Sequence, residues 1–165
     1  MGGAMSKRLE SVLPDRLFQL LNGDRLDDQL KKVILLVTLD ENGFPYTAML
    51  SYLEVIARDR RNIRMAPWNN STTTANMRRN PKVALLLVDT GMAYYIQGSA
   101  AELEREMPGF PGMAKINVYI DSVLEDKALD YEGSASITTG VQFENPQMDA
   151  AYIERGRRVL EALKH

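Results

Sequence analysis

The sequence predicts an α+β protein that is mainly β, built as a small antiparallel barrel of about six strands with added helices. Two observations lead to this prediction. Apolar segments between residues 32 and 104 are separated by tight turns, which is typical of an antiparallel meander. Apolar residues at helical spacing flank this region. The length of 165 residues suits a single domain over 1–165. Its expected parts are N-terminal helices at about 6–31, a barrel at about 32–143 and a C-terminal helix at about 146–164.

The N-terminal part is expected to form two short helices. Apolar residues between 9 and 21 have helical spacing across 6–21, and Pro14 suits the opening turn of a helix that begins near Leu13. Asn22 and Gly23 end this helix. Asp24 is expected to cap the second helix, which continues to residue 30.

Barrel strands are expected where apolar runs lie between turns. They cover residues 32–39, 46–56, 62–66, 82–89, 93–104 and 134–143. Gly43 supplies the positive φ that the first hairpin turn requires, and Pro67 ends the third strand.

Three further helices are expected in the second half of the chain. A short one follows the hydroxyl residues at 71–74 and ends at Asn80 and Pro81. A second is expected after residue 112, because six apolar residues share one helical face: Met113, Ile116, Tyr119, Ile120, Val123 and Leu124. The last opens at Asn145, with these residues inward: Met148, Ala151, Tyr152, Val159, Leu160 and Leu163.

Composition excludes several kinds of chemistry. Cysteine is absent and the one histidine is His165, so we expect no disulfide, thiolate nucleophile, cysteine- or histidine-ligated metal site or histidine-based triad. Asp and Glu could still bind magnesium or calcium, but no EF-hand spacing occurs, and we expect no metal site. The net charge of -2 and the short apolar runs favour neither nucleic acid nor a membrane as partner. We expect a cytoplasmic protein. If it is an enzyme, a bound cofactor supplies the difficult chemistry, because no side chain stands out as acid or base.

The hydroxyl run Ser71, Thr72, Thr73 and Thr74 lies at a predicted helix start. Free backbone N–H groups and the positive end of the helix dipole attract phosphate there, and hydroxyls add donors. Arg64, on the preceding strand, offers a charge-assisted fork to the same anion. The alternative interpretation is that one hydroxyl simply caps the helix.

The strand after the first hairpin is a second candidate ligand surface. Thr47, Met49 and Ser51 share one face, while Ala48 lies on the other. This mixture of polar and apolar side chains suits a planar ligand with polar edges. An edge strand with one solvent-exposed face has the same pattern, and this is the alternative interpretation. Trp68, in a loop, is either a core residue or an aromatic wall. Gln97 either forms a hydrogen bond to a ring nitrogen or carbonyl of the ligand or is a solvent-facing strand residue.

The order of these segments resembles the pyridoxamine 5'-phosphate oxidase-like family. That family has a D-x-x-G-x-P hairpin, matched here by Asp40, Gly43 and Pro45, followed by a strand that runs along a flavin. It continues with a basic strand residue, a hydroxyl-rich phosphate loop, a short helix and an N-P strand. These resemble Arg64, residues 71–74, residues 75–79 and Asn80 with Pro81. The resemblance covers roughly 30–103, and its short motifs depend on their order.

The resemblance implies a split β-barrel that dimerises with itself and holds FMN at the interface. Arg64 and residues 71–74 would hold the FMN phosphate. Thr47, Ala48, Met49 and Ser51 would contact the ring and ribityl chain, with Trp68 and Gln97 at the flavin edge. The implied activity is hydride transfer between the flavin and a small-molecule substrate. A non-catalytic flavin-binding or stress-response module and a deazaflavin-dependent reductase are the alternatives.

The chain also departs from true pyridoxamine phosphate oxidases. It has threonine where they have lysine in the phosphate site, and it lacks their C-terminal histidine and arginine motif. Vitamin B6 oxidation is therefore not implied. The lack of an internal histidine argues against a histidine-ligated heme.

Overall fold

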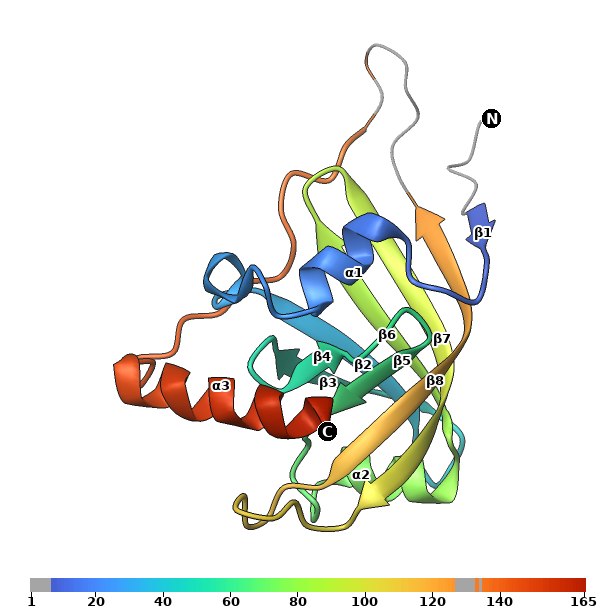
Figure 1. Ribbon diagram of the computed structural model, residues 1–165. Coiled ribbons are helices and arrows are strands. Elements are labelled where there is room, and N and C mark those ends of the chain that lie inside the picture. The colour runs from blue at the N-terminus through green and yellow to red at the C-terminus, as the bar shows by residue number, and fades with distance from the viewer. Residues whose placement is uncertain (1–6, 127–132, 134) are drawn as a thin grey trace.

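The computed structural model describes residues 7–126, 133 and 135–165. The strands are β1 (Lys7–Leu9), β2 (Val33–Leu39), β3 (Pro45–Ser51), β4 (Val55–Ala57), β5 (Asn62–Met65), β6 (Lys82–Asp89), β7 (Met92–Glu104) and β8 (Lys115–Asp126). They form one sheet in the order β3-β2-β6-β7-β8-β5-β4, with β1 paired to β8, and every pairing is antiparallel. Figure 1 shows the sheet curled into a half-barrel. This confirms the predicted α+β split barrel, although the described residues form eight strands where about six were expected.

The helices cover the open parts of this half-barrel. They are α1 (Asp15–Leu21), the short 3-10 helix η1 (Leu26–Gln29), α2 (Thr72–Arg79) and α3 (Ala150–Lys164). α2 lies at one end of the sheet and α1 toward the other (Figure 1). None of the described helices has the length and apolar character needed to cross a bilayer.

The core lies on the inner face of the sheet. Alternate residues of the central strands are fully buried, such as Ile34 and Leu36 on β2 and Leu85 on β6. Period-two alternation sends these side chains to one face, and Leu17 of α1 and Leu163 of α3 cover them. One connected cluster therefore joins the helices to the barrel.

The hairpin between β2 and β3 forms as predicted. Gly43 has φ +82°, and the Asp40 carboxylate accepts hydrogen bonds from the N–H groups of Asn42 at 2.8 Å and Phe44 at 2.9 Å. These local bonds set the register in which Thr47 lies opposite Val37 and Ser51 lies opposite Val33. The turn thus places the outward-facing residues of β3.

The helix expected after residue 112 is wrong, because residues 115–126 form strand β8. Its apolar residues fit both periods, but Ile116, Val118 and Ile120 are buried while Tyr119 and Asp121 are exposed. β8 pairs with β7 on one side and with β5 and β1 on the other. Pairing on both sides satisfies its backbone and overrides the helical spacing.

Other expectations need smaller corrections. The N-terminal residues 7–9 form β1 instead of extending a helix, and Arg25, not Asp24, precedes η1. The strand expected over 46–56 is broken by a turn in which Glu54 N donates to Ser51 O at 3.2 Å. The strand expected over 134–143 is wrong for the described residues 135–143, where Gln142 makes only a bridge to Lys32. Residue 134 lies outside the described residues.

The C-terminal helix begins later than predicted. Asp149 caps it by accepting a hydrogen bond from Tyr152 N at 2.8 Å, so α3 starts at Ala150. Ala151 and Tyr152 are exposed, whereas Val159, Leu160 and Leu163 are buried as expected.

Candidate functional site

The start of α2 gathers three of the predicted residues in one hydrogen-bonded turn. Ser71 Oγ accepts from Thr74 N at 3.2 Å and lies 3.0 Å from Thr74 Oγ1, which donates to Trp68 O at 2.7 Å. The hydroxyls of Ser71 and Thr74 are therefore used by the fold. Those of Thr72 and Thr73 make no hydrogen bond to another described residue. Their backbone amides are first-turn donors without acceptors in the helix.

Trp68 is an exposed aromatic surface beside this turn. Its side chain is 56% exposed, and its ring lies over Gly112, where an added Cβ would meet ring atoms at 3.4 Å. Asn69 N donates to Gly112 O at 2.8 Å, and Trp68 pairs with Met113. The aromatic wall is thus held by the loop between β7 and β8.

α3 adds a cation near this wall that sequence reasoning missed. Arg155 Nη2 lies 3.7 Å from Sδ of Met113, the partner of Trp68. The basic run at 155–158 has the pattern of a solvated helix face, and Arg155, Arg157 and Arg158 are all exposed. Nothing in the sequence indicates that α3 packs against the loop that holds Trp68.

Arg64 is directed elsewhere. It is 7% exposed, and its Nη1 donates to the carbonyl of Leu163, near the end of α3, at 2.8 Å. Its Nε is buried without a partner among the described residues. Burial, with a further effect of Arg58, lowers the pKa of the Arg64 guanidinium from its usual range. Arg64 therefore secures α3 and does not join the described turn at Trp68 and Ser71.

β3 presents its outward face at the edge of the sheet. Met49 is 70% exposed, and Thr47 and Ser51 lie on the same face, while Leu50 is buried on the other. Ala48 shares that other face and is half-buried. The chain therefore exposes the face that carries Thr47, Met49 and Ser51.

Gln97 shares this outward face with Thr47. The register aligns one row of residues across five strands: Thr47, Val37, Ala84, Gln97 and Ser122. Three strand spacings separate Thr47 from Gln97, or about 14 Å. Gln97 Oε1 accepts from Ser122 Oγ at 2.8 Å, and it lines a hollow of about 380 Å³. The same hollow includes Lys82, which pairs with Asp121 at 3.1 Å.

Glu54 is a second residue that sequence reasoning missed. Its Oε1 accepts from Ser51 N at 3.1 Å, and its carbonyl accepts from Ala66 N at 2.9 Å, so it joins the end of β3 to the segment that leads to Trp68. Burial raises the pKa of its carboxyl to about 7, against the opposing effect of the Ser51 hydrogen bond. An isolated acid in the otherwise apolar stretch 52–57 was the available signal.

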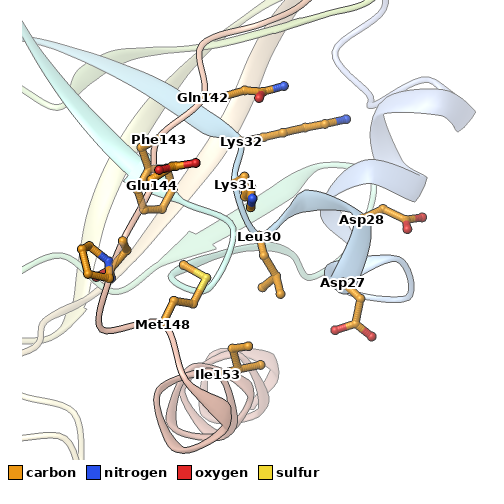
Figure 2. A pocket seen from close by; sticks show the side chains of 12 residues that line it. Asp27, Asp28, Leu30, Lys31, Lys32, Gln142, Phe143, Glu144, Met148 and Ile153 are labelled. Atoms are coloured by element: carbon orange, nitrogen blue, oxygen red, sulfur yellow. The ribbon is translucent and has the colours of Figure 1, made fainter.

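A larger cavity of about 730 Å³ lies between η1, the segment that leads into β2 and the start of α3 (Figure 2). It contains none of the predicted site residues. Within 7–126, 133 and 135–165, no cluster of three or more acidic or histidine side chains is placed to hold a metal ion.

Comparisons with known proteins agree with this architecture. Residues 29–139 match the sequence pattern of the family described as pyridoxamine 5'-phosphate oxidase. The chain is 34% identical to the uncharacterized protein YclD of Bacillus subtilis (strain 168), over 93% of this chain and 97% of that protein.

Solved structures show the same fold at lower identity. A candidate pyridoxamine 5'-phosphate oxidase of Lactobacillus delbrueckii is 20% identical, with a TM-score of 0.57 over 71% of this chain and 98% of that one. HupZ of Group A Streptococcus is 13% identical, with a TM-score of 0.53 over 80% of this chain and 99% of that one.

Proposed function

The chain belongs to the pyridoxamine 5'-phosphate oxidase-like family, and from this we propose that it binds FMN and acts as a flavin-dependent oxidoreductase on a small molecule. The observation that carries the proposal is the start of α2. There, two amides and two hydroxyls, those of Thr72 and Thr73, have no acceptor within the described part of the fold, next to an exposed tryptophan. This is a donor set that fits a phosphate and a neighbouring flat ring.

One set of residues binds the phosphate or supports the turn that binds it. Thr72 and Thr73 bind the phosphate, while Ser71 and Thr74 hold the turn in shape. Arg64 supports the site indirectly by fixing α3, because its Nη1 is already bonded to Leu163. Arg155 adds positive charge at Met113, whose backbone pairs with that of Trp68.

The flavin ring needs a surface that excludes water and offers polar edges. Thr47, Met49 and Ser51 provide that surface along β3, Ala48 contributes backbone, and Trp68 and Gln97 border the ring. When bound, FMN supplies the hydride chemistry, and the protein supplies position and electrostatics.

The partner that completes this site is a second copy of the chain. A half-exposed apolar row crosses the outward face of the sheet, formed by Met49, Leu35, Leu86, Tyr95 and Leu124. It runs beside the row that contains Thr47 and Gln97, so covering it would also enclose the flavin residues. A contiguous apolar surface of this kind favours association.

FMN titration of the purified protein tests the proposal. We expect the visible flavin bands to shift and the melting temperature to rise with FMN. A Thr72→Ala, Thr73→Ala double variant should lose binding at least tenfold, while Thr138→Ala, at an exposed position away from the site, should not. A protein that neither shifts nor is stabilised by FMN would disprove the proposal.

Two further measurements separate the alternatives within the fold. Tight FMN binding without turnover by NADH or NADPH and any electron acceptor would indicate a non-catalytic flavin module. Tighter binding of a deazaflavin than of FMN, in parallel titrations, would indicate a deazaflavin-dependent reductase.

A further inference from the structure

The cavity of about 730 Å³ between η1 and the start of α3 has no role in the proposed flavin site. It forms where residues 142–148 cross from the sheet to α3. Phe143 N donates to Lys31 O at 2.9 Å, and Gln142 forms a bridge with Lys32, so its wall is bonded to the start of β2. A cavity of this size suits a small organic molecule.

One side of the cavity is apolar. Leu30, Met148 and Ile153 converge on it from three different segments, as Figure 2 shows, and each is only half-buried. Phe143 and Pro146 border the same space. Covering these side chains with an apolar group of a ligand would remove apolar surface from water and so favour binding.

Most of the charges around the cavity are already paired. Asp27 binds Arg157 at 2.6 Å, Asp28 binds Arg25 at 3.0 Å, and Lys32 binds Asp89 at 2.8 Å. In Figure 2, Asp27 and Asp28 point away from the apolar side chains. These three groups therefore contribute little charge to a ligand.

Two charges of opposite sign remain at the cavity. Lys31, in the turn before β2, and Glu144, on the crossing segment, have no ion-pair partner in the part of the chain that the structure describes. Gln142 and Asn145 also line the wall, but Gln142 Nε2 already donates to Thr139 Oγ1 and Asn145 Oδ1 already accepts from Gln147 N. The cavity thus offers one positive and one negative group together with an apolar surface.

We propose that this cavity binds a small zwitterion with a large apolar side chain, the chemistry of a free aromatic or branched amino acid. Its carboxylate pairs with Lys31, its ammonium group pairs with Glu144, and its side chain packs on Leu30, Met148 and Ile153. The assignment is independent of the flavin site.

Calorimetric titration with three related probes tests this assignment. The probes are L-phenylalanine, 3-phenylpropanoate, which lacks the amine, and 2-phenylethylamine, which lacks the carboxylate. We expect L-phenylalanine to bind tightest, and each single-charge probe to bind about threefold to fivefold more weakly, as exposed charge pairs allow. Equal affinity for all three, or no binding at millimolar concentration, would overturn the proposal.

Two charge variants locate the binding. Lys31→Met should weaken L-phenylalanine and 3-phenylpropanoate by about threefold to fivefold and leave 2-phenylethylamine unchanged. Glu144→Gln should weaken L-phenylalanine and 2-phenylethylamine and leave 3-phenylpropanoate unchanged. Both side chains are exposed, so the fold should tolerate either change. If neither variant alters the order of the probes, the ligand binds elsewhere and the assignment is wrong.

The apolar contact needs its own variant. Ile153→Ala should weaken all three probes by a similar factor, whereas Ala151→Ser, at an exposed position on α3, should weaken none. Amide chemical shifts of the wild-type protein provide a second measurement if Ile153→Ala fails to fold. L-phenylalanine should shift residues 30–32 and 142–148, and shifts confined to other segments would contradict the proposal.

Discussion

Glu54 is the residue whose ionisation the fold disturbs most directly at the candidate site. Burial raises the pKa of its carboxyl from 4.5 to about 7, even though Ser51 N donates to it. The folded chain therefore keeps a proton that the unfolded chain has already lost. The protonated carboxyl of Glu54 stabilises the folded state relative to the folded state with an ionised carboxylate. This stabilisation is fully present below pH 4.5 and is lost as the pH rises through about 7.

Replacing this carboxyl with an amide should reveal the effect. We expect Glu54→Gln to raise the free energy of unfolding at pH 8 by about 1–3 kcal/mol, because one pKa unit corresponds to about 1.4 kcal/mol and partial solvent access reduces the total. At pH 4 the variant and the wild type should be alike. Urea denaturation at both pH values measures this, with Glu41→Gln in an exposed turn as the control. An equal effect at both pH values would contradict the explanation.

Arg64 is the second residue with a distinct role. Removing its guanidinium leaves the buried carbonyl of Leu163 without its donor. We expect Arg64→Met to lower the free energy of unfolding by about 2–3 kcal/mol in the absence of any flavin, and the exposed Arg61→Met to lower it by less than about 0.5 kcal/mol. Equal stabilities in urea would refute the structural role of Arg64.

The sequence predicts local contacts at the candidate site but not long-range ones. The cap at Ser71 follows from local rules, because a hydroxyl at a helix start bonds an amide three residues away. The partner of Arg64 could not be foreseen, because Leu163 lies 99 residues further along the chain. The contact of Arg155 with Met113 is also long-range, since the two residues lie 42 positions apart, although Arg155 itself is exposed as the basic run predicts.

Among the elements, α3 depends on one glycine for its close approach to the barrel. A Cβ at Gly156 would lie 2.7 Å from Leu53 Cδ2 and 2.9 Å from Leu53 Cβ, so α3 packs against the turn before β4 without a side chain between them. Its neighbours in the sequence, Arg155 and Arg157, are exposed.

Alanine at this position has two opposing effects. It favours the helix by up to about 1 kcal/mol, but the overlap with Leu53 costs about 1–3 kcal/mol. We expect Gly156→Ala to destabilise the protein on balance, and Gly156→Ala combined with Leu53→Ala to show positive coupling in a double-mutant cycle. Glu154→Ala, exposed on α3, is the control for helix propensity. A stabilised Gly156→Ala variant would show that α3 shifts freely.

The start of α2 allows stability and ligand binding to be separated. Ser71→Ala should cost about 1 kcal/mol through loss of the cap. Ser71→Asp should keep the cap, and therefore the melting temperature, but repel the FMN phosphate and weaken binding at least tenfold. Calorimetry of both variants measures the difference. Unchanged FMN affinity in Ser71→Asp would place the phosphate elsewhere.

Strands joined by short turns were predictable and β8 was not. The β2–β3 and β6–β7 hairpins follow from residues adjacent in the sequence. β8 follows a connection of residues 105–114 that is too long to identify as a hairpin turn, and its apolar pattern suits either period. On its other side it pairs with β5 and β1, which come from distant parts of the chain. Its identity is settled by tertiary pairing.

At the scale of the whole molecule, the outward face of the sheet carries a row of apolar side chains that are exposed or only half-buried. The proposed dimer would cover the row from Met49 to Leu124, so a charge at its edge should prevent association. We expect Met49→Lys to halve the mass seen by light scattering, while Leu103→Lys, an exposed residue of β7 outside that row, leaves the mass unchanged. A wild-type protein that is monomeric with FMN present would contradict the dimer.

The curvature of the barrel was also beyond sequence reasoning. A register shift between Gln97 and Gly98 bends β7 against β8. A Cβ at Gly98 would lie 2.5 Å from Tyr119 O, so only glycine allows the two backbones to approach this closely. One glycine in a strand indicates a bulge in general terms, but not which neighbour it approaches.

The bond between Arg64 and Leu163 also decides how the C-terminus can be handled in the laboratory. An affinity tag added after His165, whose side chain is 81% exposed, leaves this bond intact. Trimming the last three residues with a carboxypeptidase would instead remove the acceptor of a buried guanidinium. A purification tag attached after His165 is therefore compatible with this hydrogen bond. Shortened versions of the chain should end no earlier than Lys164, so that Leu163 is kept.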